Sequence, residues 1–118
     1  MNDGPLDTLF GNRTAAKLLV YLYHYGEAYA RGAARDMGVA LSPVQRQFDK
    51  LEAGGWLVSK MLGNTRVYAF NPRLPATAKL KELVRVFYEG MSVREREQLF
   101  STRRRPRRRG KPVTGSDA

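Results

Sequence analysis

The chain has 118 residues, of which 42% are hydrophobic, and this suggests one domain with a compact core. It contains no cysteine, which excludes disulfides and thiolate metal sites, and it has no run of 18 apolar residues that could span a membrane. The formal net charge of +10 favours a polyanionic partner, and nucleic acid is the commonest one.

The positive charge is unevenly placed. Residues 1–102 hold 14 Lys and Arg against 10 Asp and Glu, whereas residues 103–118 hold 7 against 1. We therefore expect a mildly basic folded domain over 1–102 and a basic, disordered tail over 103–118. The N-terminus has no basic and apolar run of the signal-peptide kind, so we expect no signal peptide, and the absence of cysteine fits a cytoplasmic protein.

The first elements are expected to be helices. A short helix over 5–10 precedes a longer one over 13–25, for which Asn12 is a suitable N-cap. Apolar residues mark two sides of this longer helix, so it is either central or shared with another subunit. A short helix over 29–37 follows, and Gly38 can end it in a left-handed conformation.

The stretch over 42–70 is the most informative. Ser42 and Gln45 match a capping box and Pro43 suits a first turn, so a helix begins near Ser42, or one residue earlier, and runs to 53. Alternating residues over 56–62 and 65–70 then flank Gly63-Asn64, which predicts a hairpin with a two-residue turn.

Two further helices are expected at the C-terminal side. An apolar stripe predicts one over 75–89, and a second capping box, Ser92 to Glu95, opens another over 93–105. The fold class is therefore mainly α with a small β-hairpin (α+β), in the order of a winged helix-turn-helix with extra C-terminal helices.

This order can place the helix over 42–53 in the major groove of duplex DNA. Arg46 and Lys50 could reach guanine edges, Gln45 or Gln47 could reach adenine, and the helix start at Ser42-Pro43 could hold a phosphate. Lys60, Asn64 and Arg66 of the hairpin could contact the backbone or the minor groove. Arg103, Arg104 and Arg105 open the tail and could add loose contacts. Asp49 would be repelled by phosphates, although it could accept a bond from cytosine.

Several stretches together resemble ArsR-like winged helix-turn-helix transcriptional regulators, over about residues 9–72. They are Leu9-Phe10-Gly11-Asn12-Arg13-Thr14-Ala15-Ala16-Lys17-Leu18-Leu19, Ser42-Pro43-Val44-Gln45-Arg46-Gln47-Phe48, Leu51-Glu52-Ala53-Gly54-Gly55-Trp56-Leu57-Val58 and Gly63-Asn64-Thr65-Arg66-Val67-Tyr68.

The resemblance implies a homodimer that binds an inverted repeat and usually represses transcription. A DNA-binding protein of this kind is expected in the cytoplasm with the nucleoid. The resemblance also implies a dimer surface from the first and last helices, here Ala16, Val20, Tyr23, Leu80, Leu83, Val84 and Phe87. A core within one chain is the alternative for these residues.

The chain departs from the family at some positions. Gly32 stands where a good helix former is usual, and Ala40 stands where a capping serine is frequent. The thiolate metal sensor of the family is absent. His24 with Glu27 is too little for a metal site, so we expect no metal and no cofactor, and any effector is unidentified.

Two other functions remain open. A winged helix can dock proteins through the same surfaces, and the arginine tail alone could give non-specific nucleic-acid binding. Catalysis is not expected, because no nucleophile motif, phosphate-binding glycine loop or carboxylate cluster is present.

Overall fold

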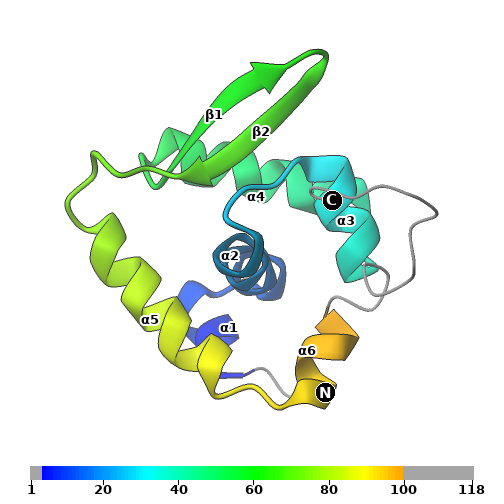
Figure 1. Cartoon of the computed structure of the whole chain (residues 1–118), viewed down its shortest axis with the longest axis vertical. Coiled ribbons are helices and arrows are strands. Elements are labelled where there is room, and N and C mark those ends of the chain that lie inside the picture. The colour runs from blue at the N-terminus through cyan, green and yellow to red at the C-terminus, as the bar shows by residue number, and fades with distance from the viewer. Residues whose placement is uncertain (1–3, 100–118) are drawn as a thin grey trace.

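The computed structural model of the chain describes residues 4–99. Its elements follow in the order α1 (Pro5–Phe10), α2 (Arg13–Tyr25), α3 (Ala30–Met37), α4 (Leu41–Ala53), β1 (Leu57–Leu62), β2 (Thr65–Phe70), α5 (Thr77–Glu89) and α6 (Val93–Leu99). Helices surround α2, and the hairpin projects from one side (Figure 1). The predicted fold class, mainly helical with one hairpin, is confirmed.

Helix α2 is the centre of the molecule. Asn12 Oδ1 accepts a hydrogen bond from Ala15 N at 2.9 Å, as the sequence predicted. Leu18, Leu19 and Leu22 are fully buried, and α1, α3, α4 and α5 all pack against this helix. The Leu18, Leu19 and Leu22 side of α2 therefore faces the interior of one chain.

Helices α3 and α4 form the helix-turn-helix unit. Gly38 ends α3 with a φ of 68°, the left-handed conformation expected of it. Helix α4 begins at Leu41, the alternative start, and Ala40 is its N-cap without any side-chain capping bond. The capping box expected at Ser42 therefore does not form, because Ser42 already lies in the first turn and the Gln45 amide bonds elsewhere.

The hairpin has the predicted two-residue turn. Leu62 pairs with Thr65 across Gly63-Asn64, and Gly63 has the positive φ, 62°, that such turns require. An isolated β-bridge, which was not predicted from the sequence, joins Ala28 to the hairpin. Ala28 N donates to Tyr68 O at 3.0 Å and Tyr68 N donates to Ala28 O at 2.7 Å, which fixes β2 to the link between α2 and α3.

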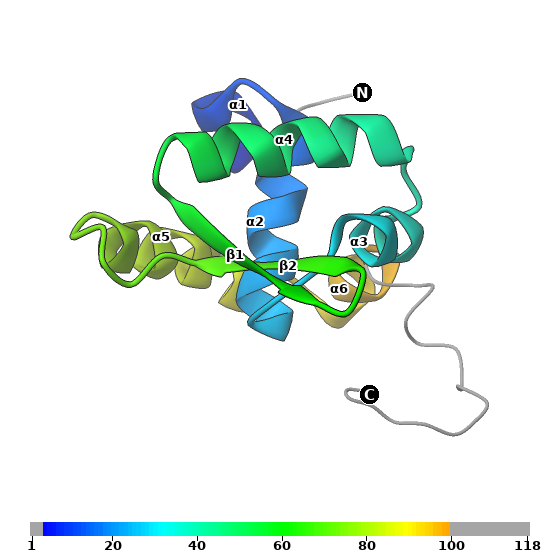
Figure 2. The same ribbon diagram turned by 90° about the horizontal axis from the view of Figure 1, so that it is seen from above.

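The core joins α4 to the hairpin through an aromatic stack. The rings of Phe48 and Tyr68 are nearly parallel, with centroids 4.1 Å apart, and both side chains are buried. A buried polar bond joins α2 to α3, because Tyr21 Oη donates to the Asp36 carboxylate at 2.6 Å. Helix α4 crosses over α2, and the hairpin extends toward α3 (Figure 2). This packing sets the angle between α4 and the hairpin.

The last two helices begin close to their predicted positions. Helix α5 begins at Thr77 rather than at 75, because Leu74 to Thr77 form a turn first, in which Thr77 N donates to Leu74 O. The predicted capping box of α6 is confirmed: Ser92 N donates to Glu95 Oε1 and Glu95 N donates to Ser92 Oγ. The expected continuation to 105 and the tail over 103–118 lie outside the described residues.

Candidate nucleic-acid interface

One face of α4 carries an exposed polar row. Ser42, Arg46 and Lys50 stand four residues apart and are all exposed, whereas Val44 and Phe48 on the opposite face are fully buried. Pro43 is half-buried beside Ser42 in the first turn, where backbone N–H groups lack helical partners anyway. The structure thus brings three predicted DNA-contacting side chains onto one open surface.

A second row of α4 faces the hairpin. Gln45 Nε2 donates to Asp49 Oδ1 at 3.0 Å and to Tyr68 Oη at 3.1 Å. These bonds link α4 to β2 and orient the exposed Asp49 carboxylate. Both bonds use the Nε2 group, so a bidentate contact of Gln45 with adenine would have to replace at least one of them.

The burial of Gln47 revises its predicted role. Only 8% of this residue is exposed, because it lies three residues after Val44 and completes the inward stripe that continues to Phe48 and Leu51. Gln47 is therefore a core residue of α4 and not a group on its open face.

The hairpin presents two kinds of side chain. Lys60, Asn64 and Arg66 are exposed, as predicted for backbone contacts. Arg66 Nη1 donates to Ser59 Oγ at 3.0 Å, and Ser59 Oγ donates to Glu52 Oε2 at 2.6 Å, so the guanidinium is held beside the end of α4. Met61 and Leu62 are about half exposed, at 51% and 52%, and add apolar side chains to the hairpin.

A polar hollow of about 390 Å³ separates α4 from the hairpin tip. Its lining includes Gln45 and Asp49 of α4, Asn64 and Arg66 of the hairpin, and Arg31 of α3. Arg31 was not among the residues predicted from the sequence, although a cation in the first turn of the helix before α4 was a usable signal. The hollow has the position and polarity to receive one strand of a nucleic-acid backbone.

Tyr29 forms another part of this hollow, and Gly32 makes room for it. A Cβ atom on Gly32 would lie 2.7 Å from Cζ of the Tyr29 ring, so glycine lets the ring lie on α3. Arg35 stands near this ring, and its Nε donates to Asp36 Oδ1 at 3.3 Å. Partial burial by itself would lower the pKa of Arg35, but the neighbouring Tyr29 and Asp36 side chains raise that pKa above its ordinary value. The glycine that looked unfavourable for a helix thus has a packing reason.

The residues predicted for a dimer surface divide into two groups. Ala16, Val20 and Val84 are 3%, 6% and 0% exposed, because α2 and α5 pack against each other within one chain. This burial revises the prediction and favours the alternative of a core within one chain for these three. Tyr23, Leu80, Leu83 and Phe87 are half-buried at its edge.

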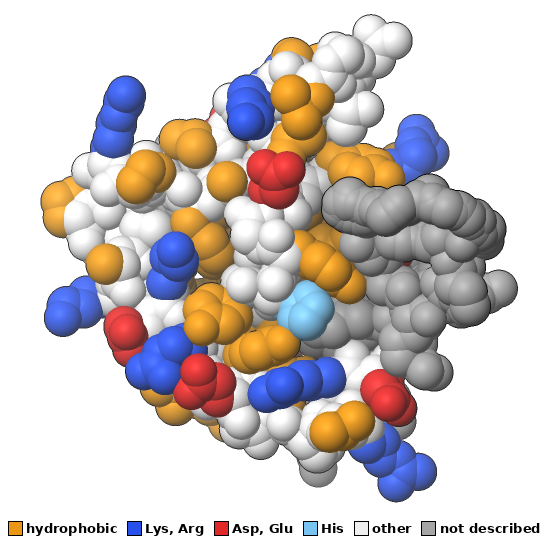
Figure 3. Space-filling model, in the orientation of Figure 1, with side chains coloured by type: hydrophobic (Ala, Val, Ile, Leu, Met, Phe, Trp, Pro, Cys, Tyr) orange, Lys and Arg blue, Asp and Glu red, His pale blue; other side chains and the backbone are white. Residues whose placement is uncertain are grey.

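The outer surface of α5 is partly charged. Arg85 bridges Glu82 and Glu89, both at 2.8 Å, and the bond from Arg85 lowers the pKa of Glu82. Val86 stands beside this network and is 57% exposed. Figure 3 shows acidic and basic side chains next to hydrophobic ones on this side of the molecule.

His24 is exposed, and its Nδ1 is hydrogen-bonded to Tyr88 Oη, so it links the end of α2 to α5. Residues 4–99 contain no group of three His, Asp or Glu residues that could hold a metal ion. Within the same range, no helix is long and apolar enough to cross a membrane.

Comparison with known proteins identifies the fold. No protein-family model matches the sequence, and no curated protein is significantly similar to it. The structure is similar to that of the AntR antimony-specific transcriptional repressor, with 24% identity and a TM-score of 0.56 over 72% of this chain and 75% of that one. It is also similar to a MepR-like protein complexed with pseudoligands, with 18% identity and a TM-score of 0.52 over 82% of this chain and 75% of that one. These likenesses support the winged helix-turn-helix fold.

Proposed function

We propose that this chain is a sequence-specific, double-stranded DNA-binding transcriptional regulator. The observation that carries the proposal is the exposed row Ser42, Arg46 and Lys50 on α4, next to a polar hollow and a basic hairpin. An α-helix of this kind fits the major groove, where Arg and Lys recognise guanine O6 and N7. The hairpin then lies over the adjacent backbone or minor groove.

The charges of this surface favour a phosphate backbone. Arg31, Arg46, Lys50, Lys60 and Arg66 are exposed cations, and the carboxylates among them are Asp49 and Glu52. Glu52 accepts the bond from Ser59, and Asp49 accepts the bond from Gln45. Asp49 lies at the hollow and would repel a phosphate placed against it. It therefore disfavours positions of the protein along the DNA that bring a phosphate to this point.

A single domain offers one recognition helix, and therefore one half-site. We infer a homodimer that reads an inverted repeat, with Val86 and the half-buried Leu80, Leu83 and Phe87 of α5 as the candidate interface. Such a dimer would repress transcription by covering a promoter, and it would lie with the nucleoid in the cytoplasm. We propose repression and not activation because the structurally similar AntR protein is a transcriptional repressor.

The tail is proposed to add affinity and not specificity. Deleting residues 103–118 removes seven Lys and Arg residues. Each lost phosphate contact should reduce the slope of log K against log salt by about one unit, while site preference is kept. Equal affinity of the full and truncated chains at physiological salt would contradict the role of Arg103, Arg104 and Arg105, and loss of all binding would show that the folded domain is not the reader.

Footprinting tests the main proposal. The full chain is incubated at low salt with the duplex upstream of its own coding region and with a pool of genomic duplexes. Protection of a discrete site, which a Lys79→Ala control on α5 retains and an Arg46→Ala/Lys50→Ala variant loses, is the expected result. Absence of any protected site would count against it.

Protein docking is a second candidate function, favoured by the apolar hairpin surface. Val58, Met61 and Leu62 of β1 are all exposed. A partner that binds there should be lost in a Met61→Ser/Leu62→Ser variant while DNA binding by α4 persists. Loss of both activities together would instead assign these side chains to the DNA interface.

A further inference from the structure

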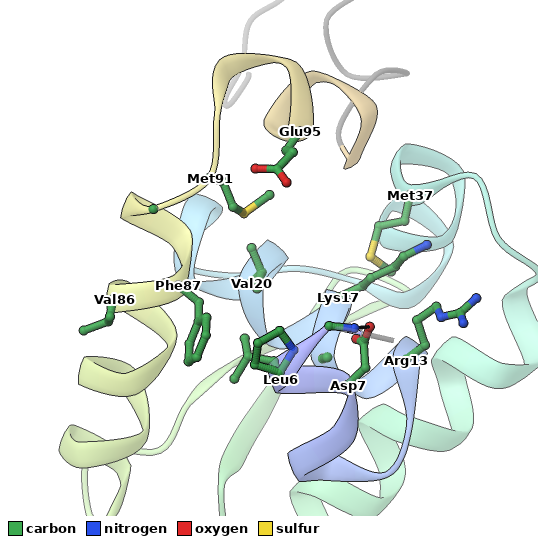
Figure 4. A pocket seen from close by; sticks show the side chains of 14 residues that line it. Leu6, Asp7, Arg13, Lys17, Val20, Met37, Val86, Phe87, Met91 and Glu95 are labelled. Atoms are coloured by element: carbon green, nitrogen blue, oxygen red, sulfur yellow. Dashed lines mark hydrogen bonds between the residues drawn. The ribbon is translucent and has the colours of Figure 1, made fainter. Parts of the chain in front are cut away.

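A hollow of about 780 Å³ lies on the side of α2 away from the hairpin. It is bounded by α1, α2, the end of α5 and the start of α6, and Met37 reaches it from the end of α3 (Figure 4). Its volume is within the range of sites that hold a small organic molecule, about 300–1,000 Å³. None of the proposed DNA-contacting residues lines it.

Most of its wall is apolar. Leu6, Val20, Phe87, Met37 and Met91 line it, and Figure 4 shows the two methionines at different sides of the hollow. Methionine side chains adapt to the shape of what they contact, and a phenylalanine ring offers a flat surface. The wall therefore suits the hydrocarbon body of a ligand.

The charged groups at the hollow are not equivalent. Its two carboxylates act as helix caps, since Asp7 Oδ2 accepts a bond from Gly4 N and Glu95 Oε1 accepts one from Ser92 N, both at 2.8 Å. Lys17 of α2 is half-buried in the lining and has no hydrogen bond or ion pair to another residue within 4–99. Its ammonium group is thus the charge available to a ligand, and Arg13 adds a second positive charge to the lining.

We propose that this hollow binds an organic anion, in which a carboxylate pairs with Lys17 and an apolar body lies against Val20, Phe87 and Met91. A half-buried cation beside hydrocarbon favours a ligand that supplies both parts, because a neutral apolar ligand would leave the ammonium group unpaired. The ligand is therefore an aryl or alkyl carboxylate.

The position of the hollow connects such a ligand to DNA reading. Met37 is the last residue of α3, whose turn leads into α4, while Phe87 belongs to α5 at the candidate dimer interface. A ligand between them affects DNA binding only if its contacts differ between the two states. We expect a change in DNA affinity of about 5- to 150-fold, and this part rests on the proposed function.

Calorimetric titration of the full chain without DNA tests the site. The ligands are 2-naphthoate and octanoate, each compared with its neutral amide, and the variants are Lys17→Gln and Lys79→Gln. Lys79 is an exposed lysine of α5 outside the hollow, so its variant is a matched control for the loss of one charge. A carboxylate should bind the wild type and Lys79→Gln equally, and Lys17→Gln at least about tenfold more weakly. Its amide should not distinguish the variants.

Three results would overturn the proposal: no saturable binding of either carboxylate, equal binding by Lys17→Gln and Lys79→Gln, or equal binding of acid and amide. The hollow could instead be filled by a second copy of the chain, and sedimentation of a Met91→Arg variant tests this alternative. If that variant dissociates a dimer and no carboxylate binds the wild type, the hollow belongs to a second copy of the chain.

A separate titration of DNA with and without saturating carboxylate examines the coupling. Ligand binding without any DNA binding would contradict the proposed function alone, whereas DNA binding without ligand binding would contradict the ligand site alone.

Discussion

Helices α4 and α5 have the same length, 13 residues each, but they are covered very differently. Helix α4 packs against α2, α3 and β1, and what it leaves open is polar: Ser42, Arg46 and Lys50. Helix α5 packs mainly against α2 and leaves Leu80, Leu83 and Phe87 half-covered, with Val86 exposed. A helix that is well packed on the core and has a polar outer face suits a nucleic acid. A helix with a half-covered apolar face suits another protein chain.

The largest expected effect is on stability and concerns the packing of α4 on the core. Phe48→Ala removes the buried ring that stacks on Tyr68, and it should lower the free energy of unfolding by about 3–5 kcal/mol. Urea unfolding followed by circular dichroism measures it. Val86→Ala on α5 is the comparison and should cost well under 1 kcal/mol, since its side chain is exposed. Similar losses for both would mean that the two helices are equally buried.

Base reading by α4 is expected to be local. Arg46→Ala should cost about 1–3 kcal/mol of discrimination at one base position, because a bidentate contact to guanine is lost. Affinities for a bound site and its single-base variants, measured by fluorescence anisotropy, give this value. Arg73→Ala, an exposed arginine after the hairpin, is the control. A loss that is uniform over all sequences would identify Arg46 as a phosphate contact instead.

The apolar face of α5 should respond to charge through assembly. Val86→Glu places a carboxylate on the candidate interface and should weaken a dimer at least about tenfold, or about 1.4 kcal/mol. Analytical ultracentrifugation over a concentration series measures this change. Ala78→Glu, an exposed position earlier on α5, should leave assembly unchanged. If both variants sediment like the wild type, α5 is not the interface.

The smallest effect concerns the Tyr29 ring. Gly32→Ala adds a Cβ that meets this ring, which is exposed enough to move aside. The gain in helix propensity and the cost of displacing the ring should cancel, so the free energy of unfolding should change by less than about 1 kcal/mol. DNA affinity should fall while stability is kept, because Tyr29 leaves the hollow beside α4. A destabilisation well above that value, with the DNA affinity of the folded fraction unaltered, would show that Tyr29 serves packing only.

Local signals in the sequence predicted much of this fold. Asn12, Gly38, Gly63 and the Ser92–Glu95 capping box each act within a few residues, and each has its expected role in the structure. The bridge between Ala28 and Tyr68 could not be predicted in this way, because a single paired residue has no periodicity.

The candidate sites were harder to predict, because the burial of side chains on one face of a helix depends on what packs against that face. Gln47 lies at the spacing of an inward residue, but its polarity suggested the open face. For Ala16, Val20 and Val84, the same apolar pattern fits a partner chain or the chain itself, and only the α2–α5 packing distinguishes the two. The hollow at Lys17 joins residues of five helices, so no short sequence motif marks it.

Selection of bound sites from random duplexes by the full chain tests the central claim, that α4 reads base sequence, most directly. We expect enrichment of an inverted repeat with half-sites about 10–10.5 base pairs apart, or a multiple of that. In Arg46→Ala, the preference at one position of each half-site should be lost. A selected pool that is indistinguishable from the starting pool would contradict it.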